Sequence, residues 1–217
     1  MKNNIQTLYY IHDPMCSWCW AFRPVWLQLQ AELKHQLSEP ISIQYLLGGL
    51  AADTDLAMPP SMQKQIQRHW QVIGQRVRGT QFNFDFWIQC EARRSTYPAC
   101  RAVIAARGQG IHFEQAMIFA IQQAYYLEAC NPSDDAVLLK IAAQLALQPD
   151  QFYTDFYATE TKDQLQQEIK QSQSMGCAGF PSLILNDEDG INHNIGIDYN
   201  HTEPMFKQIS AVTHHES

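Results

Sequence analysis

The residues best suited to chemistry are two cysteines three positions apart, in Cys16-Ser17-Trp18-Cys19. A short apolar strand is predicted to end at Asp13-Pro14, and helical spacing begins at Cys16, so the Cys16 sulfur is expected at the N-terminus of a helix. Unpaired backbone N–H groups and the positive end of the helix dipole favour a thiolate there. Cys19 follows one turn later on the same face, within reach of a disulfide. The pair predicts a redox dithiol with Cys16 as the nucleophile.

The spacing leaves two other interpretations open: a pair of buried, inert cysteines, or half of a zinc site that His12 would join. Six cysteines in 217 residues produce some C-x-x-C pair by chance in about one sequence in seven. A zinc site needs further ligands, and the sequence has no second C-x-x-C and no H-x-x-x-H. Closing so short a loop stabilises the fold by only about 2 kcal/mol, which suits a bond that forms and breaks. We expect neither a metal nor a cofactor.

Composition limits the partners and the compartment. Lys and Arg number 15 against 22 Asp and Glu, a formal charge of −7, and no basic run occurs. This charge argues against nucleic acid and anionic membranes as partners. No apolar stretch is long enough to span a membrane, and residues 1–8 lack the apolar core of a leader. We expect a cytoplasmic protein, whose cysteines are not a structural disulfide framework.

Hydrophobic periodicity predicts β–α–β, then a large helical block, then β–β–α. The first unit is a strand at 6–11, a helix from 16, and a strand at 41–47 closed by Gly48-Gly49, which favours parallel strands. Residues 79–92 show no clear period and are expected to be a loop. The remaining elements are helices at 61–78, 99–107, 112–129, 134–147, 150–157 and 161–174, strands at 180–185 and 191–197, and a last helix at 203–213.

Residues 13–20, Asp13-Pro14-Met15-Cys16-Ser17-Trp18-Cys19-Trp20, resemble the active-site stretch of cytoplasmic DsbA-like thiol-disulfide oxidoreductases, the FrnE-like branch of the thioredoxin superfamily. Gly179-Phe180-Pro181-Ser182 falls where that family has its cis-proline loop. The resemblance implies an α/β, thioredoxin-like fold with a large all-helical insertion. It places a discontinuous thioredoxin-like domain at 1–57 and 176–217 and a helical insertion domain at 58–175.

The same resemblance implies roles for residues around the dithiol. Pro181 would be cis and lie beside the cysteines, and the backbone of Phe180 would pair with an extended substrate segment. Trp18 and Phe180 would add an apolar patch, with Trp18 at the surface and Trp20 in the core. Many relatives carry an acid six positions before the nucleophile, where this chain has Tyr10. Either His12 or Asp13 is then a candidate to tune the dithiol and take the Cys19 proton.

The other cysteines, and an aromatic stripe in the helical block, are expected to be structural. Cys90, Cys100, Cys130 and Cys177 are predicted to be buried bystanders. The stripe is expected to pack helices, although it could wall a cleft over Cys16. It consists of Phe113, Phe119, Tyr125 and Tyr126.

The sequence therefore predicts a thiol-disulfide oxidoreductase or isomerase that works through a mixed disulfide at Cys16, resolved by Cys19. Its substrate would be the disulfide of a protein or a small thiol, with a cytosolic thiol reductant or oxidant as electron partner. Two alternatives on the same fold are a non-enzymatic client-binding adaptor and a glutathione-dependent isomerase or transferase. Relatives of the last kind carry Ser where this chain has Cys16.

Overall fold

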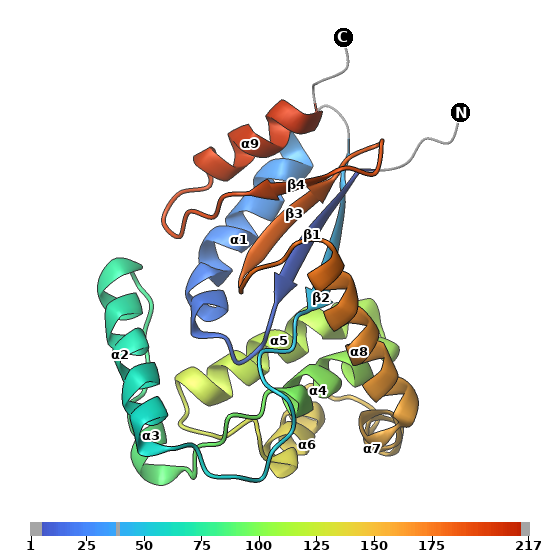
Figure 1. The fold of residues 1–217 in the computed structure, drawn as a ribbon. Helices are drawn as coiled ribbons and strands as arrows, with labels where there is room; N and C mark the ends of the chain where they lie inside the picture. The colour runs from blue at the N-terminus through green and yellow to red at the C-terminus, as the bar shows by residue number, and fades with distance from the viewer. Residues whose placement is uncertain (1–5, 38–39, 214–217) are drawn as a thin grey trace.

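A four-stranded sheet forms the centre of the computed structural model, which describes residues 6–37 and 40–213. Its strands are β1 (Thr7–His12), β2 (Ser42–Leu47), β3 (Ser182–Asn186) and β4 (Asn192–Ile195), in the order β2-β1-β3-β4. β1 and β2 are parallel, whereas β3 is antiparallel to both β1 and β4 (Figure 1). The predicted parallel β–α–β unit and the C-terminal hairpin are confirmed. The prediction that residues 1–8 lack the apolar core of a leader falls mostly on residues 1–5, which lie outside the described residues.

Both faces of the sheet are covered. The side chains of the inner strand β1 alternate between the two faces, so each face has apolar side chains to bury. Leu8 and Tyr10 pack toward α1 (Ser17–Gln36) and α9 (Glu203–Thr213), with Trp26 at the centre of that cluster. Ile11 packs to the opposite side with Ile184, beneath Phe180. This layering brings the end of β1, the start of α1 and the loop before β3 together.

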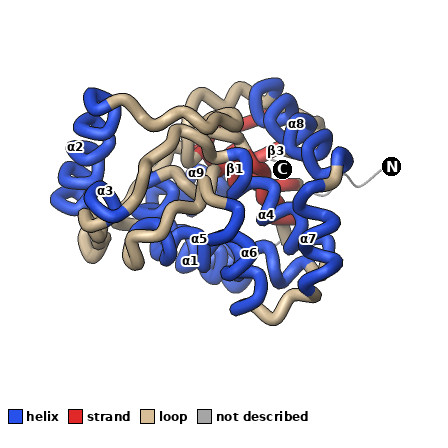
Figure 2. The backbone as a smooth tube through the Cα atoms, turned by 90° about the horizontal axis from the view of Figure 1, so that it is seen from below, coloured by secondary structure: helices blue, strands red, loops and turns tan. Residues whose placement is uncertain are grey.

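Seven helices between β2 and β3 form a second core. They are α2 (Pro60–Arg76), α3 (Phe86–Gln89), α4 (Tyr97–Gly108), α5 (Ile111–Tyr126), α6 (Asp135–Gln144), α7 (Pro149–Tyr157) and α8 (Thr159–Ser174). Most of them lie beyond the ends of β1 and β2 in Figure 1. From below, α2 and α3 are on one side of the molecule and α7 and α8 on the other (Figure 2). The predicted fold class is confirmed, while the domain boundaries at 58 and 175 stay a prediction.

The expectation of a loop across residues 79–92 was wrong in one place, because Phe86–Gln89 form the single helical turn α3. The turn is held by the Phe86 side chain, which is buried against Trp70 and Tyr125. One turn is too short to show a period in the sequence.

A buried ionic cluster joins the helical core to the sheet. The Arg107 guanidinium on α4 pairs with Glu114 on α5, Nη1 to Oε1 at 2.8 Å, and with Glu168 on α8. The other Glu168 oxygen accepts the Leu47 N–H at 2.9 Å, at the end of β2. The cluster thus fixes the turn at Gly48-Gly49. None of the helices within residues 6–37 and 40–213 is long and apolar enough to cross a membrane.

Candidate active site

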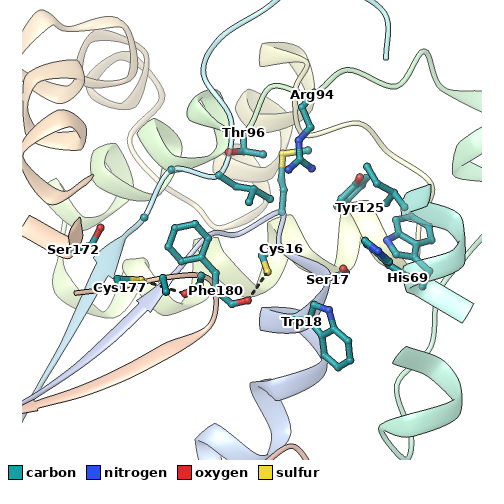
Figure 3. A pocket seen from close by; sticks show the side chains of 18 of the residues that line it. Cys16, Ser17, Trp18, His69, Arg94, Thr96, Tyr125, Ser172, Cys177 and Phe180 are labelled. Carbon is teal, nitrogen blue, oxygen red and sulfur yellow. Dashed lines mark hydrogen bonds between the residues drawn. The ribbon is translucent and has the colours of Figure 1, made fainter. Parts of the chain in front are cut away.

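Cys16 is the N-cap residue of α1 and lies at the junction predicted from the sequence. Its N–H donates to the Asp13 carbonyl at 3.0 Å, and its carbonyl accepts the Trp20 N–H at 3.0 Å. Its thiol points toward the loop before β3 and donates to the Phe180 carbonyl, with sulfur and oxygen 3.5 Å apart (Figure 3). The sulfur therefore has the helix N-terminus behind it and the Phe180 loop beside it.

A cavity of about 440 Å³ opens onto Cys16. In Figure 3, Trp18 lies below the Cys16 sulfur, with Phe180 on one side and His69 on the other. Cys16 is 7% exposed and lines the cavity, whereas Cys19 is 0% exposed and does not. One sulfur of the pair can be reached from solvent, and the other lies behind it.

Burial controls the protonation of Cys19. It raises the pKa of the Cys19 thiol well above its ordinary value, and the neighbouring Cys16 raises this pKa further. Both cysteines are thiols in this structure. A buried thiol of high pKa stays protonated until its neighbour has reacted, which suits a resolving role.

Tyr10 contacts Cys19, and the sequence analysis did not assign it that role. Burial and the neighbouring Cys19 raise the Tyr10 pKa, so the hydroxyl keeps its proton and can donate to sulfur. Tyr10 stacks on Trp26, with ring centroids 4.8 Å apart, which holds the hydroxyl in place. The signal in the sequence was its position, six residues before Cys16.

Asp13 clamps the loop that carries Cys16. Its buried carboxylate accepts the Met15 N–H at 2.8 Å, the Leu50 N–H at 2.7 Å and the Thr96 hydroxyl at 2.6 Å. Burial raises the Asp13 pKa, and these donors oppose the rise. The main chain of Asp13 hydrogen-bonds the Cys19 thiol, whereas its carboxylate binds the Gly48-Gly49 side of the site and the start of α4.

His12 is the second candidate that the sequence offered, and it is fully buried. Neither ring nitrogen has a hydrogen-bond partner among the described residues, and the ring stacks on Tyr10 with centroids 5.0 Å apart. Burial, reinforced by the charge of Arg107, lowers the pKa of His12 to about 3. The ring is therefore neutral at physiological pH. The tuning roles of His12 and Asp13 stay predictions.

The Phe180–Pro181 peptide bond is cis, as the resemblance predicts. Pro181 is buried, whereas Phe180 lines the cavity. The Phe180 ring lies directly on Gly48, where an added Cβ would come within 1.9 Å of its Cε1 atom. Only glycine at position 48 allows the ring this approach, which brings the Phe180 carbonyl to Cys16.

Several predictions about exposure were wrong. Trp18 and Trp20 are both half-buried: Trp18 lines the cavity, and Trp20 packs on Tyr126 at the edge of the helical core. Of the four remaining cysteines only Cys100 is fully buried. The other three, Cys90, Cys130 and Cys177, are half-buried, because each lies in a loop or at a helix end. Cys177 lines the cavity, and so does Tyr125 from the aromatic stripe.

Two neighbouring arginines line the cavity and differ in their partners. The Arg93 side chain pairs with Asp134 and donates to the Ser133 carbonyl at 2.9 Å. Arg94 has no carboxylate within ion-pair distance in the described part of the chain. Its guanidinium lies on the opposite side of Cys16 from Trp18 (Figure 3). The cavity thus combines a reachable sulfur with an uncompensated positive charge, which sequence reasoning missed.

Across the described ranges, no group of three or more His, Cys, Asp or Glu side chains could hold a metal ion. The arrangement at Cys16 and Cys19 can carry two electrons by opening and closing one S–S bond.

Comparison with known proteins matches this fold to a family. The sequence model described as "Thioredoxin" matches residues 9–208. The chain belongs to the thioredoxin family. The match covers most of the sheet, α1 and all the helices of the insertion, and the predicted membership of the thioredoxin superfamily is confirmed.

Solved thioredoxin-family structures superpose along nearly the whole chain. A structure described as a putative protein disulfide isomerase from Nitrosomonas europaea is 25% identical, with a TM-score of 0.84, covering 99% of this chain and all of that one. The cytosolic disulfide reductase DsbM from Pseudomonas aeruginosa is 23% identical, with a TM-score of 0.73, covering 94% of this chain and 97% of its own; it has also been solved with GSH.

Curated relatives carry another description. The ClpXP adapter protein SpxH is 24% identical over 189 residues in Bacillus cereus, covering 84% of this chain and 61% of the relative. SpxH from Bacillus subtilis is 22% identical over 204 residues. The chain thus spans about three fifths of the length of these relatives.

Proposed function

We propose that this thioredoxin-family protein is a cytoplasmic thiol-disulfide oxidoreductase with Cys16 as nucleophile and Cys19 as resolving thiol. The observation that carries the proposal is the difference between the two sulfurs: Cys16 lines a cavity at a helix N-terminus, and Cys19 is buried directly behind it. A reachable position at a helix N-terminus is typical of nucleophilic cysteines, which attack disulfides.

The exchange takes two steps. The Cys16 thiolate attacks one sulfur of a substrate disulfide, the S–S bond breaks, and one substrate thiolate leaves. Cys19 then loses its proton and attacks the Cys16 sulfur, which expels the second substrate thiolate and leaves a Cys16–Cys19 disulfide. The substrate gains two electrons and the protein loses two, and the reverse direction uses the same atoms. The protonated Tyr10 hydroxyl beside Cys19 would donate to the resolving thiolate as it forms and stabilise it.

The cavity favours an anionic thiol of low molecular weight as one partner. Arg94 supplies a positive charge that has no carboxylate partner within residues 6–37 and 40–213, and glutathione carries carboxylates that would pair with it. The structural neighbour DsbM has been solved with GSH, which supports the same class of partner. The Phe180 and Trp18 side chains offer apolar contact to a peptide, so an exposed protein disulfide is the second substrate class.

Exchange activity tests the proposal. The wild-type chain should reduce insulin disulfides with glutathione as electron donor, or oxidise a dithiol peptide with oxidised glutathione. Cys16→Ser should abolish both, and Cys19→Ser should accumulate a mixed disulfide at Cys16 that mass spectrometry detects. Cys177→Ser is the matched control, because it removes another thiol at the cavity. Turnover by Cys16→Ser would contradict the proposal.

A client-binding adaptor is the second candidate, because the curated relatives are described as ClpXP adapter proteins. The double variant Cys16→Ser/Cys19→Ser separates the two functions. An adaptor would bind a client protein with unchanged affinity without its dithiol, whereas an oxidoreductase would lose turnover completely. Wild-type client binding together with the absence of disulfide exchange would favour the adaptor.

A further inference from the structure

We propose that Cys90 and Cys130 form a second dithiol, which a small disulfide such as oxidised glutathione converts to an intramolecular disulfide. The two residues lie outside the cavity at Cys16, on loops that follow two different helices. Cys90 is the C-cap residue of α3, and Cys130 follows the last turn of α5.

The two cysteines are close in space. The Cys90 thiol donates to the Ala129 carbonyl, with sulfur and oxygen 3.0 Å apart. Covalent geometry places that oxygen about 2.8 Å from the Cys130 Cα atom, so the Cys90 sulfur lies within about 6 Å of it. The thiol of Cys130 also contributes to the electrostatic environment of Cys90. A disulfide needs an S–S distance of about 2.05 Å, so the two side chains must rotate toward each other before the bond forms.

Backbone hydrogen bonds hold both cysteines in place. The Cys90 N–H donates to the Phe86 carbonyl at 3.0 Å, and the Cys130 N–H donates to the Ala124 carbonyl at 2.9 Å. One residue further along each segment, the Asn131 side-chain amide donates to the Glu91 carbonyl at 3.0 Å. The pair is therefore positioned by hydrogen bonds on both sides of it.

Both thiols are also accessible, since each is half-buried. Cys100, by contrast, is fully buried and donates to Asp13, and Cys177 lies beside Gly179 and Ser182. Of the four cysteines outside the C-x-x-C motif, Cys90 and Cys130 are the two that the fold brings together.

The oxidation balances with one small disulfide. The thiolate of one cysteine attacks oxidised glutathione and forms a mixed disulfide, and one glutathione thiolate leaves. The other cysteine, deprotonated, attacks the protein sulfur of that mixed disulfide and expels the second glutathione. The two protein thiols give up two electrons and two protons, and two glutathione thiols are formed.

The surroundings make this exchange slow at neutral pH. Burial raises the pKa of the Cys90 thiol, which lowers the fraction present as thiolate at neutral pH. Such a pair follows the redox state of the glutathione pool rather than turning substrate over. Residues 91–94 continue from Cys90 to Arg93 and Arg94 in the cavity wall, so the disulfide would restrain that wall.

Peptide mapping tests the pair independently of the proposed activity. The Cys16→Ser/Cys19→Ser chain is incubated with oxidised glutathione at pH 8, alkylated and digested with trypsin. Cleavage after Arg78, Arg93, Arg107 and Lys140 leaves Cys90 in peptide 79–93 and Cys130 in peptide 108–140, each with no other cysteine. We expect these two peptides linked by a disulfide, and Cys177, as the matched control, carrying glutathione alone.

Two further samples test whether the disulfide link is specific to Cys90 and Cys130. Cys90→Ser should leave Cys130 carrying glutathione, because its partner is missing. The wild-type chain should give the same 79–93/108–140 link, which shows that the link does not depend on the double variant. The proposal is overturned if Cys90 and Cys130 each carry glutathione separately, or stay alkylated, in excess oxidised glutathione.

Discussion

The protein carries two pairs of cysteines whose positions relative to helix ends are opposite. Cys16 begins α1 and Cys19 lies one turn inside it, whereas Cys90 and Cys130 follow the ends of α3 and α5. A helix N-terminus favours a thiolate, whereas burial raises the pKa of the Cys90 thiol. The same side chain is therefore suited to fast nucleophilic exchange in one place and to slow, equilibrium oxidation in the other.

The largest expected difference is between two serine substitutions. Cys16→Ser should lower the rate of disulfide exchange by about a thousandfold or more, because the nucleophile forms the covalent intermediate. Cys90→Ser should leave the rate within about twofold of the wild type, a bound we set for a surface substitution that touches no reacting atom. Insulin reduction measures both. Equal losses of exchange rate in the two variants would contradict the distinction between the two cysteine pairs.

The second largest expected effect is on the stability of the fold, and it comes from the buried ring of His12. The folded-state pKa of His12, about 3, lies below the ordinary value of 6.5. The folded state therefore binds fewer protons than the unfolded state between these values. Stability is fully present above pH 6.5 and is lost as the pH falls toward 3, by about 1.4 kcal/mol per pH unit.

His12→Phe should remove this dependence. Urea denaturation of the wild type should show about 2 kcal/mol less stability at pH 5 than at pH 7 from this residue, and the variant should lack that loss. His35→Ala, an exposed histidine of α1, is the control and should keep the wild-type slope. An unchanged slope in His12→Phe would show that His12 titrates freely.

The third effect is on substrate binding by the first pair, because Arg94 lines the cavity at Cys16. Arg94→Ala should raise the KM for oxidised glutathione about tenfold, the loss expected for one charged hydrogen bond. The KM for hydroxyethyl disulfide, which is uncharged, should not change. Arg68→Ala removes an exposed charge from α2 and is the matched control. A parallel rise for both substrates would mean that Arg94 only supports the wall.

Tyr10 gives the smallest effect. Tyr10→Phe should slow release of the second substrate thiol in a single turnover about fivefold, as one hydrogen bond of about 1 kcal/mol is lost from the Cys19 thiolate. Formation of the mixed disulfide should keep its rate. Tyr9→Phe, on the opposite face of β1, is the control. Slowing of the first step instead would place the hydroxyl on Cys16.

Local signals in the sequence were sufficient for the first pair and its framework. Asp13-Pro14 and Gly48-Gly49 marked strand ends, and the helical spacing that begins at Cys16 marked the helix, because strand and helix periods are properties of neighbouring residues. The cis bond before Pro181 followed from the family resemblance.

Contacts made over long distances in the chain could not be predicted. Arg94 reaches the Cys16 cavity, and Cys90 meets Ala129, only after the insertion has folded. The half-buried positions of Cys90 and Cys130 could not be predicted for the same reason, because they depend on how the insertion folds. The turn at Phe86–Gln89 was missed because its stability comes from aromatic packing rather than from a repeat in the sequence.

The central claim is that Cys16 is the reactive, accessible thiolate of this chain. The most direct test is brief alkylation with iodoacetamide at pH 6, on the Cys19→Ser variant, followed by peptide mapping of every cysteine. The account predicts that Cys16 is modified at least about tenfold faster than Cys90 and Cys130, because its thiolate is favoured at the helix N-terminus. Modification of Cys16 at the same rate as those two thiols, or slower, would contradict it.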